Sequence, residues 1–244
     1  DVIAHAGQVR QPGRGGWGQG QAVIAQNRRA TYADGSAKMY GATNSADFRG
    51  IEGGEDHNLE VLFFWDARER LIATAINPAC PAQEAEGGLA IHADFWHPVR
   101  ETLRARYGAE LCILAWTGAG GDQTSRPMFG KAADTRMRKL RGLTRLQEVA
   151  RRVVNGWEEA YAAAQQDKQA DAVLRHTVAT IELPHRQVTA AEVEEARREA
   201  AKYAGNPAQQ WNYRWNQAVV ERYEAQQAGR EGAFAMELHT LRLG

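Results

Sequence analysis

The sequence is poor in several features that mark whole classes of protein. Only 2 of its 244 residues are cysteines, so Cys80 and Cys112 can form at most one disulfide, and the chain is not a cysteine-rich scaffold. No apolar run approaches the roughly 20 residues that a membrane-spanning helix needs. The formal net charge is zero, with 30 basic and 30 acidic residues. Bulk charge therefore draws the chain neither to nucleic acid nor to an anionic membrane.

The glycine-rich stretch GAGGDQTSRP, at residues 118–127, lacks the Gly-Lys-Ser/Thr ending of a phosphate-binding P-loop. Asp122 follows Gly121 directly, and an acid at that position would repel a phosphate group. We therefore expect no organic cofactor. The composition, 43% apolar and 25% charged, is that of an ordinary globular protein with material for one large domain or two small ones.

The order of apolar segments predicts an α/β fold with a mixed sheet and one βαβ unit. The first strand of this unit is expected at 71–76, the helix at 95–107 and the second strand at 110–116. Apolar residues recur every four positions from Phe95 to Tyr107, as they do on one face of a helix. The two strands should be parallel and joined by a right-handed crossover.

The rest of the chain is expected to belong to the same domain, so that residues 1–244 form part of one domain that is incomplete at both ends. Residues 1–22 hold many glycines and little apolar periodicity, which predicts an irregular surface segment. Residues 23–130 form the predicted α/β core. Residues 131–244 are expected to be mainly helical with two strands, AVLRHTVATIELP and AFAMELHTLRLG.

Two helices of that second half carry clear signals. Residues 134–166 present one apolar stripe, which predicts a long amphipathic helix broken near Gly142 or Gly156. Further on, Thr189 and Glu192 have the spacing of a capping box and predict the start of another helix.

The two parallel strands also indicate where a site should lie. Ligands of such sheets bind beyond the carboxyl ends of the strands, so the loops at 77–83 and 117–127 should share one edge. The second loop presents Asp122 and Thr124 to a metal or a polarised carbonyl, or Asp122 simply caps a tight turn. The predicted substrate-binding residues of the two loops are Asn77, Gln83, Gly120, Gly121 and Gln123.

The cysteines and histidines give further candidates. Cys80 is a potential nucleophile if a base lies beside it, whereas Cys112, within an apolar strand, is predicted to be a small core residue. His92 and His97 have a spacing that loosely suggests metal binding, and His57 lies in a loop with two acids. Zinc usually needs three or four converging ligands, so these three histidines are candidate metal ligands only.

Five segments together resemble one family. NRRATYADGSAKMYG, EDHNLEVLFFWD, NPACPAQ, IHADFWHPVRETLRARYG and GAGGDQTSRP occur in the order seen in the neutral/alkaline non-lysosomal ceramidase family, and they are most similar to its bacterial ceramidase-like branch. The resemblance covers about residues 20–130 well and continues weakly to the end of the chain. It implies a zinc-dependent amidase that hydrolyses the N-acyl bond of ceramide, and a secreted or periplasmic location.

The resemblance also implies roles for particular positions. Thr124 stands where the family's Gly-Asp-x-Ser-Pro segment has its active-site serine, so a hydroxyl is kept. The family's zinc-binding His-Pro pair corresponds to the region of Pro81, where this loop has no histidine. The other zinc ligands of the family would fall before Asp1 or beyond Gly244. We therefore expect the chain to be an internal piece of a longer protein.

The sequence favours a ceramidase-like hydrolase that cleaves an N-acyl amide bond of a lipid or related small molecule, with zinc as the implied cofactor. Two alternatives stay open. The first is a non-catalytic or zinc-less relative that keeps the fold and a ligand cleft. The second is a cysteine-dependent hydrolase that uses Cys80. Neither the substrate nor the oligomeric state follows from the sequence.

Overall fold

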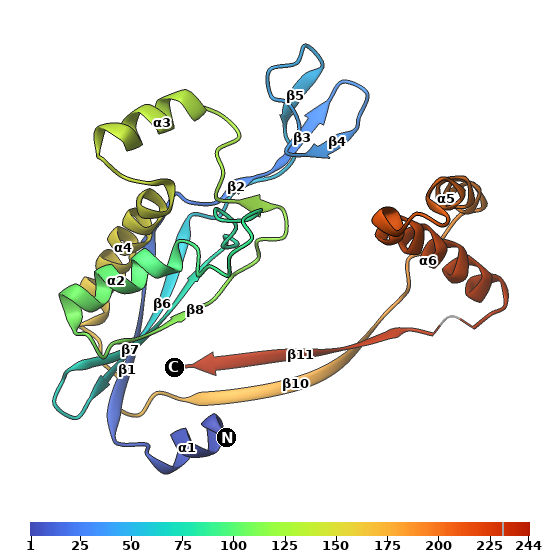
Figure 1. Ribbon diagram of the computed structural model, residues 1–244. Helices are drawn as coiled ribbons and strands as arrows, with labels where there is room; N and C mark the ends of the chain where they lie inside the picture. Colours follow the sequence, from blue (N-terminus) through green and yellow to red (C-terminus); the bar gives the residue numbers. More distant parts are fainter. Residues whose placement is uncertain (231) are drawn as a thin grey trace. The chain divides into compact units, whose positions relative to one another are not determined.

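A computed structural model describes residues 1–230 and 232–244. The chain divides into two compact units, residues 1–172 and residues 173–244. The first unit contains the main sheet, and the second contains a two-stranded ribbon and a pair of helices (Figure 1).

The main sheet confirms the predicted α/β class. It has four strands in the order β1 (Gly13–Gln21), β6 (Asn58–Asp66), β7 (Leu71–Pro78) and β8 (Cys112–Ala115). The first three strands are antiparallel, and β7 pairs with β8 in parallel. Helix α2 (Trp96–Tyr107) connects this parallel pair, so the βαβ unit lies where the spacing of apolar residues predicted it.

One face of this sheet is covered by α2 and by α4 (Arg145–Ala164), which pack against each other (Figure 1). The buried core between sheet and helices is largely aromatic. Phe63 of β6 lies edge-on to Trp157 of α4, with ring centroids 5.3 Å apart, and both side chains are fully buried. Nearly complete burial of such rings is a major part of the free energy that holds the two layers together.

The opposite face of the sheet carries exposed apolar side chains, among them Trp17, Phe64 and Leu114. Cys112 is exposed as well, so its assignment to the core was wrong. The reason is the pleat of β8, in which alternate residues face opposite ways and Ile113, not Cys112, points to the helices.

The prediction of an irregular segment at 1–22 was also wrong. Residues Val2–Gln8 form helix α1, and the glycine-rich stretch forms β1, a nine-residue strand paired along its whole length with β6. The glycines are needed because α4 packs directly on β1. A Cβ atom on Gly18 would lie 2.4 Å from the carbonyl oxygen of Ala160. A side chain there would hold the helix off the strand, so the strand has no alternating apolar pattern to detect.

The long amphipathic helix expected over 134–166 is interrupted at Gly142, one of the two predicted positions. Gly142 has φ = +68°, a conformation that favours glycine, and it separates α3 (Lys131–Leu140) from α4. Helix α4 restarts with a capping box between Thr144 and Gln147.

Two smaller sheets complete the first unit. Strands β3 (Arg29–Tyr32), β4 (Ala37–Met39) and β5 (Phe48–Ile51) form a three-stranded sheet with β3 in the middle. Strand β2 (Gln26–Asn27) pairs with β9 (Gln123–Thr124). This pairing joins the segment that follows β1 to the glycine-rich loop after β8.

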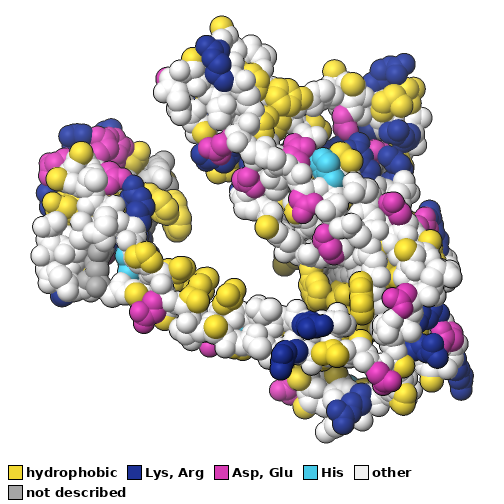
Figure 2. Space-filling view, turned by 180° about the vertical axis from the view of Figure 1, so that it is seen from behind, with side chains coloured by type: hydrophobic (Ala, Val, Ile, Leu, Met, Phe, Trp, Pro, Cys, Tyr) yellow, Lys and Arg dark blue, Asp and Glu magenta, His cyan; other side chains and the backbone are white. Residues whose placement is uncertain are grey.

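The second unit is an extended ribbon with a helical hairpin at its end. Strands β10 (Leu174–Leu183) and β11 (Phe234–Leu243) pair antiparallel over ten residues. Between them lie α5 (Ala190–Tyr203), the short 3-10 helix η1 (Pro207–Gln209) and α6 (Gln210–Gln227). Hydrophobic side chains line the ribbon in Figure 2, and nearly all of its residues are exposed.

The predicted capping box at the start of α5 is confirmed: Thr189 accepts from the backbone of Glu192, and Glu192 accepts in return from the backbone of Thr189. The helices of this unit enclose only a small core around Val188, Val193 and Val220. Within the described parts of the chain, no helix combines the length and the apolar character needed to cross a bilayer.

Candidate active site

The loops that follow β7 and β8 meet at one edge of the main sheet, as expected for parallel neighbours. The amide of Gly118 donates to the carbonyl of Pro78 over 2.9 Å. Cβ atoms on Gly118 and Gly120 would each lie 3.3 Å from backbone atoms of Ala79, closer than most real contacts allow. The glycines of the second loop therefore let it lie directly against the first.

Thr124 is held at the centre of this region by three separate parts of the chain. Pairing of β9 with β2 places Thr124 opposite Gln26. The Oγ1 atom of Thr124 lies 3.3 Å from the hydroxyl of Tyr40, which follows β4, and accepts from the amide of Arg126 over 3.2 Å. The side chain of Thr124 is fully buried.

Tyr40 has an unusual environment for a tyrosine. Its backbone has φ = +54°, which is rare outside glycine, and its hydroxyl accepts from Nη1 of Arg28 over 3.4 Å. Burial alone would raise the pKa of Tyr40. The hydrogen bonds to Thr124 and Arg28 and the positive charges of Arg28 and Arg126 outweigh burial and lower that pKa below its usual value.

A cavity of about 380 Å³ opens beside Tyr40. Four basic residues and two acidic residues line it, together with Tyr40, Pro127, Met128 and Thr135; the charged residues are Arg126, Lys131, Arg138, Arg145, Glu84 and Asp134. Because bases outnumber acids, the cavity favours ligands or reaction intermediates that carry negative charge.

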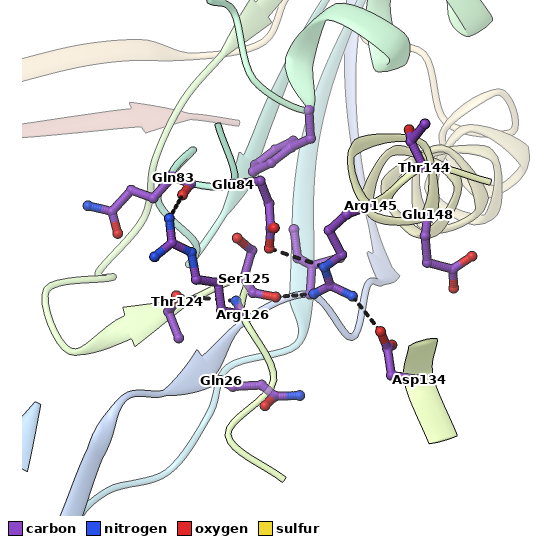
Figure 3. Close-up of polar contacts among 12 residues, drawn as sticks. Gln26, Gln83, Glu84, Thr124, Ser125, Arg126, Asp134, Thr144, Arg145 and Glu148 are labelled. Carbon is purple, nitrogen blue, oxygen red and sulfur yellow. Dashed lines mark hydrogen bonds and ion pairs between the residues drawn. The ribbon is translucent and has the colours of Figure 1, made fainter. Parts of the chain in front are cut away.

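Arg145, the first residue of α4, contacts three different segments of the chain beside this cavity, as Figure 3 shows. Its guanidinium pairs with Glu84 over 3.2 Å and with Asp134 over 3.0 Å, and it also donates to the carbonyl of Ser125. Both cavity acids thus pair with one arginine, and Asp134 pairs with Arg152 as well. Since Glu84, Ser125 and Asp134 come from three different segments, Arg145 fixes their relative positions.

Asp122, a predicted catalytic residue, is occupied by structural contacts. One carboxylate oxygen accepts from the side chain of Asn27 over 2.7 Å and the other from the side chain of Gln123 over 2.9 Å. These bonds bind β2 to the glycine-rich loop. The partners are side-chain amides and not the backbone N–H groups of a turn, and a catalytic role for Asp122 stays a prediction.

The predicted substrate-binding residues lie around the two loops but do not line the cavity with their side chains. Gln123 is buried, and its amide donates to the carbonyl of Gly54. Gln83 and Gly121 offer their backbone carbonyls to Arg126 and Arg28, over 2.8 Å and 2.7 Å.

The other two predicted contacts belong to the loop junction. The side chain of Asn77 lies near Gly118, where an added Cβ atom would be 3.5 Å from the Asn77 side-chain oxygen. Gly120 packs on Ala79 and Pro81. All five residues thus shape the site, and their contact with a substrate stays a prediction.

Cys80 faces away from the cavity. It is fully buried, and its Sγ atom lies 3.6 Å from the carbonyl oxygen of Ile24. Burial raises the pKa of Cys80 to about 12, and the nearby carboxylates Glu84 and Asp94 contribute to this rise. A thiol in these surroundings holds its proton at neutral pH, which disfavours a nucleophilic role.

The candidate metal ligands are divided between two places. His92 and His97 line a separate cavity of about 390 Å³ near the start of α2, and His92 accepts from the amide of Asp94 over 2.8 Å. His57 lies 3.4 Å from Glu55 instead. Within residues 1–230 and 232–244, no three His, Cys, Asp or Glu side chains are grouped to hold a metal ion. These residues do not fit the implied zinc, which stays a prediction of the resemblance.

Comparison with known proteins adds a distant likeness. No family model and no curated protein sequence matches the chain. The solved structures that are similar include neutral ceramidase from Pseudomonas aeruginosa, with 17% identity and a TM-score of 0.48 over 75% of this chain. A ceramidase complexed with C2 has 18% identity and a TM-score of 0.47 over 73% of this chain.

This chain covers only 28% and 27% of those two structures. At such identities the likeness concerns the fold alone, because one fold can carry many activities.

The sequence did not point to Tyr40, Arg28 or Arg145. Tyr40 and Thr124 are 84 positions apart and meet only because two-residue strands pair β2 with β9. So short a pairing leaves no periodic pattern. The one local signal was the position of Arg145 at the first turn of a helix, directly after a capping threonine.

Proposed function

We propose that the first unit contains the site of a ceramidase-like hydrolase that cleaves an N-acyl amide bond of a lipid or related compound, with Thr124 supplying the reacting hydroxyl. The observation that carries the proposal is the contact between Thr124 Oγ1 and the Tyr40 hydroxyl, beside a cavity lined by basic residues. The resemblance of the glycine-rich loop to the ceramidase family supports the same substrate class.

The chemistry follows from the lowered pKa of Tyr40. A phenolate stabilised by Arg28 accepts the proton of Thr124 as Oγ1 attacks the acyl carbon. The same proton passes to the nitrogen as the C–N bond breaks, and the amine leaves. Water then hydrolyses the threonyl ester to the free acid and restores Thr124. The charge that develops on the carbonyl oxygen is stabilised by neighbouring cations, of which Arg126 is nearest in the chain.

Access to Thr124 is the demanding step. Because its side chain is fully buried, a substrate reaches the hydroxyl only after a neighbouring side chain moves. Tyr40 is the best candidate, since it contacts Thr124 and is itself 41% exposed. Its displacement would open the cavity toward Oγ1, and its hydroxyl would have to return to Oγ1 before it accepts the proton of Thr124.

The test is a comparison of native chain with Thr124→Val and Thr124→Ser on N-acyl sphingoid bases in mixed micelles and on short, water-soluble N-acyl amines. We expect the valine variant to lose at least about a hundredfold in turnover and the serine variant to keep most of it, because only serine keeps the hydroxyl. Equal turnover by native and valine proteins would reject Thr124 as the reacting residue.

Each assay is run with and without added zinc, because the resemblance implies that metal. No step above passes through a metal ion, and within the described residues the candidate ligands lie apart. Turnover that appears only with zinc, and survives in the valine variant, would assign the chemistry to a metal-activated water instead.

One observation favours the second candidate function, a ligand-binding relative without activity: the complete burial of Thr124. In that case the cavity beside Tyr40 binds an N-acyl compound or its acid without turnover. Measured binding by the native chain, weakened by Arg126→Gln and accompanied by no product, would establish that function in place of hydrolysis.

A further inference from the structure

Helix α3 differs from the helices of the first unit that contribute to the core. None of its ten residues is buried. It is held to the unit by polar contacts on one side only: Asp134 pairs with Arg145 and Arg152, and Arg138 donates to the carbonyl of Leu143 over 3.1 Å. The apolar residues of α3 therefore contribute nothing to the packing of the fold.

The charge of this segment is strongly one-sided. Residues 131–141 contain five basic residues and one acidic residue, although the whole chain has equal numbers of each. The only acidic residue, Asp134, is already paired twice on the inner side. Within the described residues, the side chains of Lys131 and Lys139 form no hydrogen bond or ion pair. The zero net charge of the chain thus conceals a local basic surface.

Basic and apolar side chains share the outer side of the helix. At 100° per residue, Arg136 and Leu140 lie opposite the half-buried Asp134 and Arg138, and Met137 lies between Leu140 and Asp134 around the helix. Met137 is 42% exposed and Leu140 is 66% exposed. Figure 2 shows dark blue and yellow side chains together over this helix, at the upper right.

We propose that the outer side of α3 docks onto a membrane surface that contains anionic lipids. The α3 surface, defined here as Arg136, Met137, Lys139 and Leu140, has the two features of an interfacial helix. Its apolar side chains can enter the acyl boundary, and its long basic side chains can reach the headgroups around them. A shallow hollow of about 680 Å³ is lined by residues of α3 alone, Arg136, Lys139 and Leu140 among them, so no other described element lines this part of the helix.

An acidic protein partner fits the α3 surface less well than a lipid surface does. Single exposed apolar residues are common on proteins and need no partner. Here, however, two of them stand beside unpaired cations on an element that buries nothing. A partner recognised by charge alone would make no use of Met137 and Leu140, whereas a lipid surface uses both kinds of side chain.

Docking would also place the candidate site at the lipid surface. The inner side of α3, through Lys131, Asp134 and Arg138, lines the cavity beside Tyr40. A membrane bound to the outer side would therefore bring lipids close to that cavity. This link to substrate supply rests on the proposed hydrolase function, whereas the docking itself does not.

The experiment is flotation of the full chain with vesicles of phosphatidylcholine alone or mixed with phosphatidylserine. We expect binding only to the mixed vesicles, and weaker binding as salt is raised. R136Q/K139Q should weaken it about thirtyfold, because each basic side chain near an anionic surface is worth roughly a factor of five. M137S/L140S should also weaken it. Since none of these side chains is buried, the variants should keep the native unfolding temperature.

The matched controls are R197Q/R198Q on exposed α5 and V2S/I3S on exposed α1, which should bind vesicles as the native chain does. Equal binding to both kinds of vesicle, or no effect of the α3 variants, overturns the proposal. So does unchanged vesicle binding by M137S/L140S together with equally tight binding of soluble polyglutamate, which would identify a docking site for acidic proteins. Turnover of water-soluble N-acyl amines, measured in parallel, reports on the proposed hydrolysis separately.

Discussion

Gly20 of β1 lies so close to Gly156 of α4 that a Cβ atom on Gly20 would stand 1.9 Å from the carbonyl oxygen of Gly156. The approach is mutual, because a Cβ atom on Gly156 would lie 2.6 Å from the carbonyl oxygen of Gln21. Helix and strand backbones thus touch without side chains between them. This contact fixes the position of α4 on β1 and explains why glycine stands at positions 18 and 20 of β1.

Gly20→Ala should therefore destabilise the first unit. The added methyl group meets backbone atoms, which cannot rotate away, so we expect a loss of about 1–3 kcal/mol in the free energy of unfolding. Gly15→Ala is the control on the same strand, since its Cβ would be 4.0 Å from the nearest atoms, both in the Phe64 ring. Urea denaturation measures the free energy of unfolding of both variants. Equal values would mean that the backbones of α4 and β1 are not in the close contact described above.

Much of this fold was accessible from the sequence because its signals are local. The four-residue recurrence of apolar residues located α2, the threonine–glutamate spacing located the start of α5, and Gly142 marked the break before α4. Strand β1 was missed because its sequence reflects contact with a distant helix. Backbone approach selects glycine, and glycine carries no alternating pattern.

The candidate site was accessible only in part, for the same reason. Parallel pairing of β7 and β8 predicted that their outgoing loops would meet, and they do. Which side chains then face each other depends on the small β2–β9 pairing and on Arg145, both of which connect segments remote in sequence. Spacing rules could therefore find the loops but not Tyr40, and they did not reveal that Cys80, on the first loop, is buried in the core.

Thiol labelling should distinguish the two cysteines sharply. Cys112 is exposed and should react quickly with a thiol reagent, whereas Cys80 is buried with its pKa raised to about 12 and should react only on unfolding. Cys80→Ala should keep the catalytic activity that the proposed function predicts. Fast labelling of both thiols in the folded protein, or loss of turnover in a folded Cys80→Ala variant, would instead favour the cysteine-dependent alternative.

Glu148 should make the stability of the first unit depend on acid pH. Its carboxylate is fully buried, and hydrogen bonds from Arg151 and Arg152 lower its pKa to about 2 despite burial. A carboxylate with a lowered pKa stabilises the fold above pH about 4.5, and this contribution disappears as the pH falls toward about 2. At neutral pH, Glu148→Gln should cost about 2–4 kcal/mol.

The control for Glu148 is Glu158→Gln on the same helix, because Glu158 pairs with Arg106 at a partly exposed position. That change should cost at most about 1 kcal/mol. Denaturation curves recorded at several pH values give the difference in the free energy of unfolding between the native chain and Glu148→Gln. This difference should shrink below pH about 4.5. A difference that stays constant to pH about 2 would mean that the cost of Glu148→Gln does not come from loss of the ionised carboxylate.

The ionisation of Tyr40 gives the most direct measure of the proposed chemistry. Ultraviolet difference titration of native chain against Tyr40→Phe should reveal one phenol that ionises below the usual tyrosine range, because Arg28, Arg126 and Thr124 favour its phenolate. If this phenolate accepts the proton of Thr124, turnover should rise with pH through the same midpoint. Arg28→Gln removes one hydrogen bond and one positive charge, so it should shift both the titration and the rise in turnover to higher pH.

Arg49→Gln is the control, since Arg49 donates only to the backbone carbonyls of Ala46 and Phe48. A shifted titration with an unshifted rate profile would show that Tyr40 is perturbed but takes no part in proton transfer, and the hydrolytic mechanism would then need a different base.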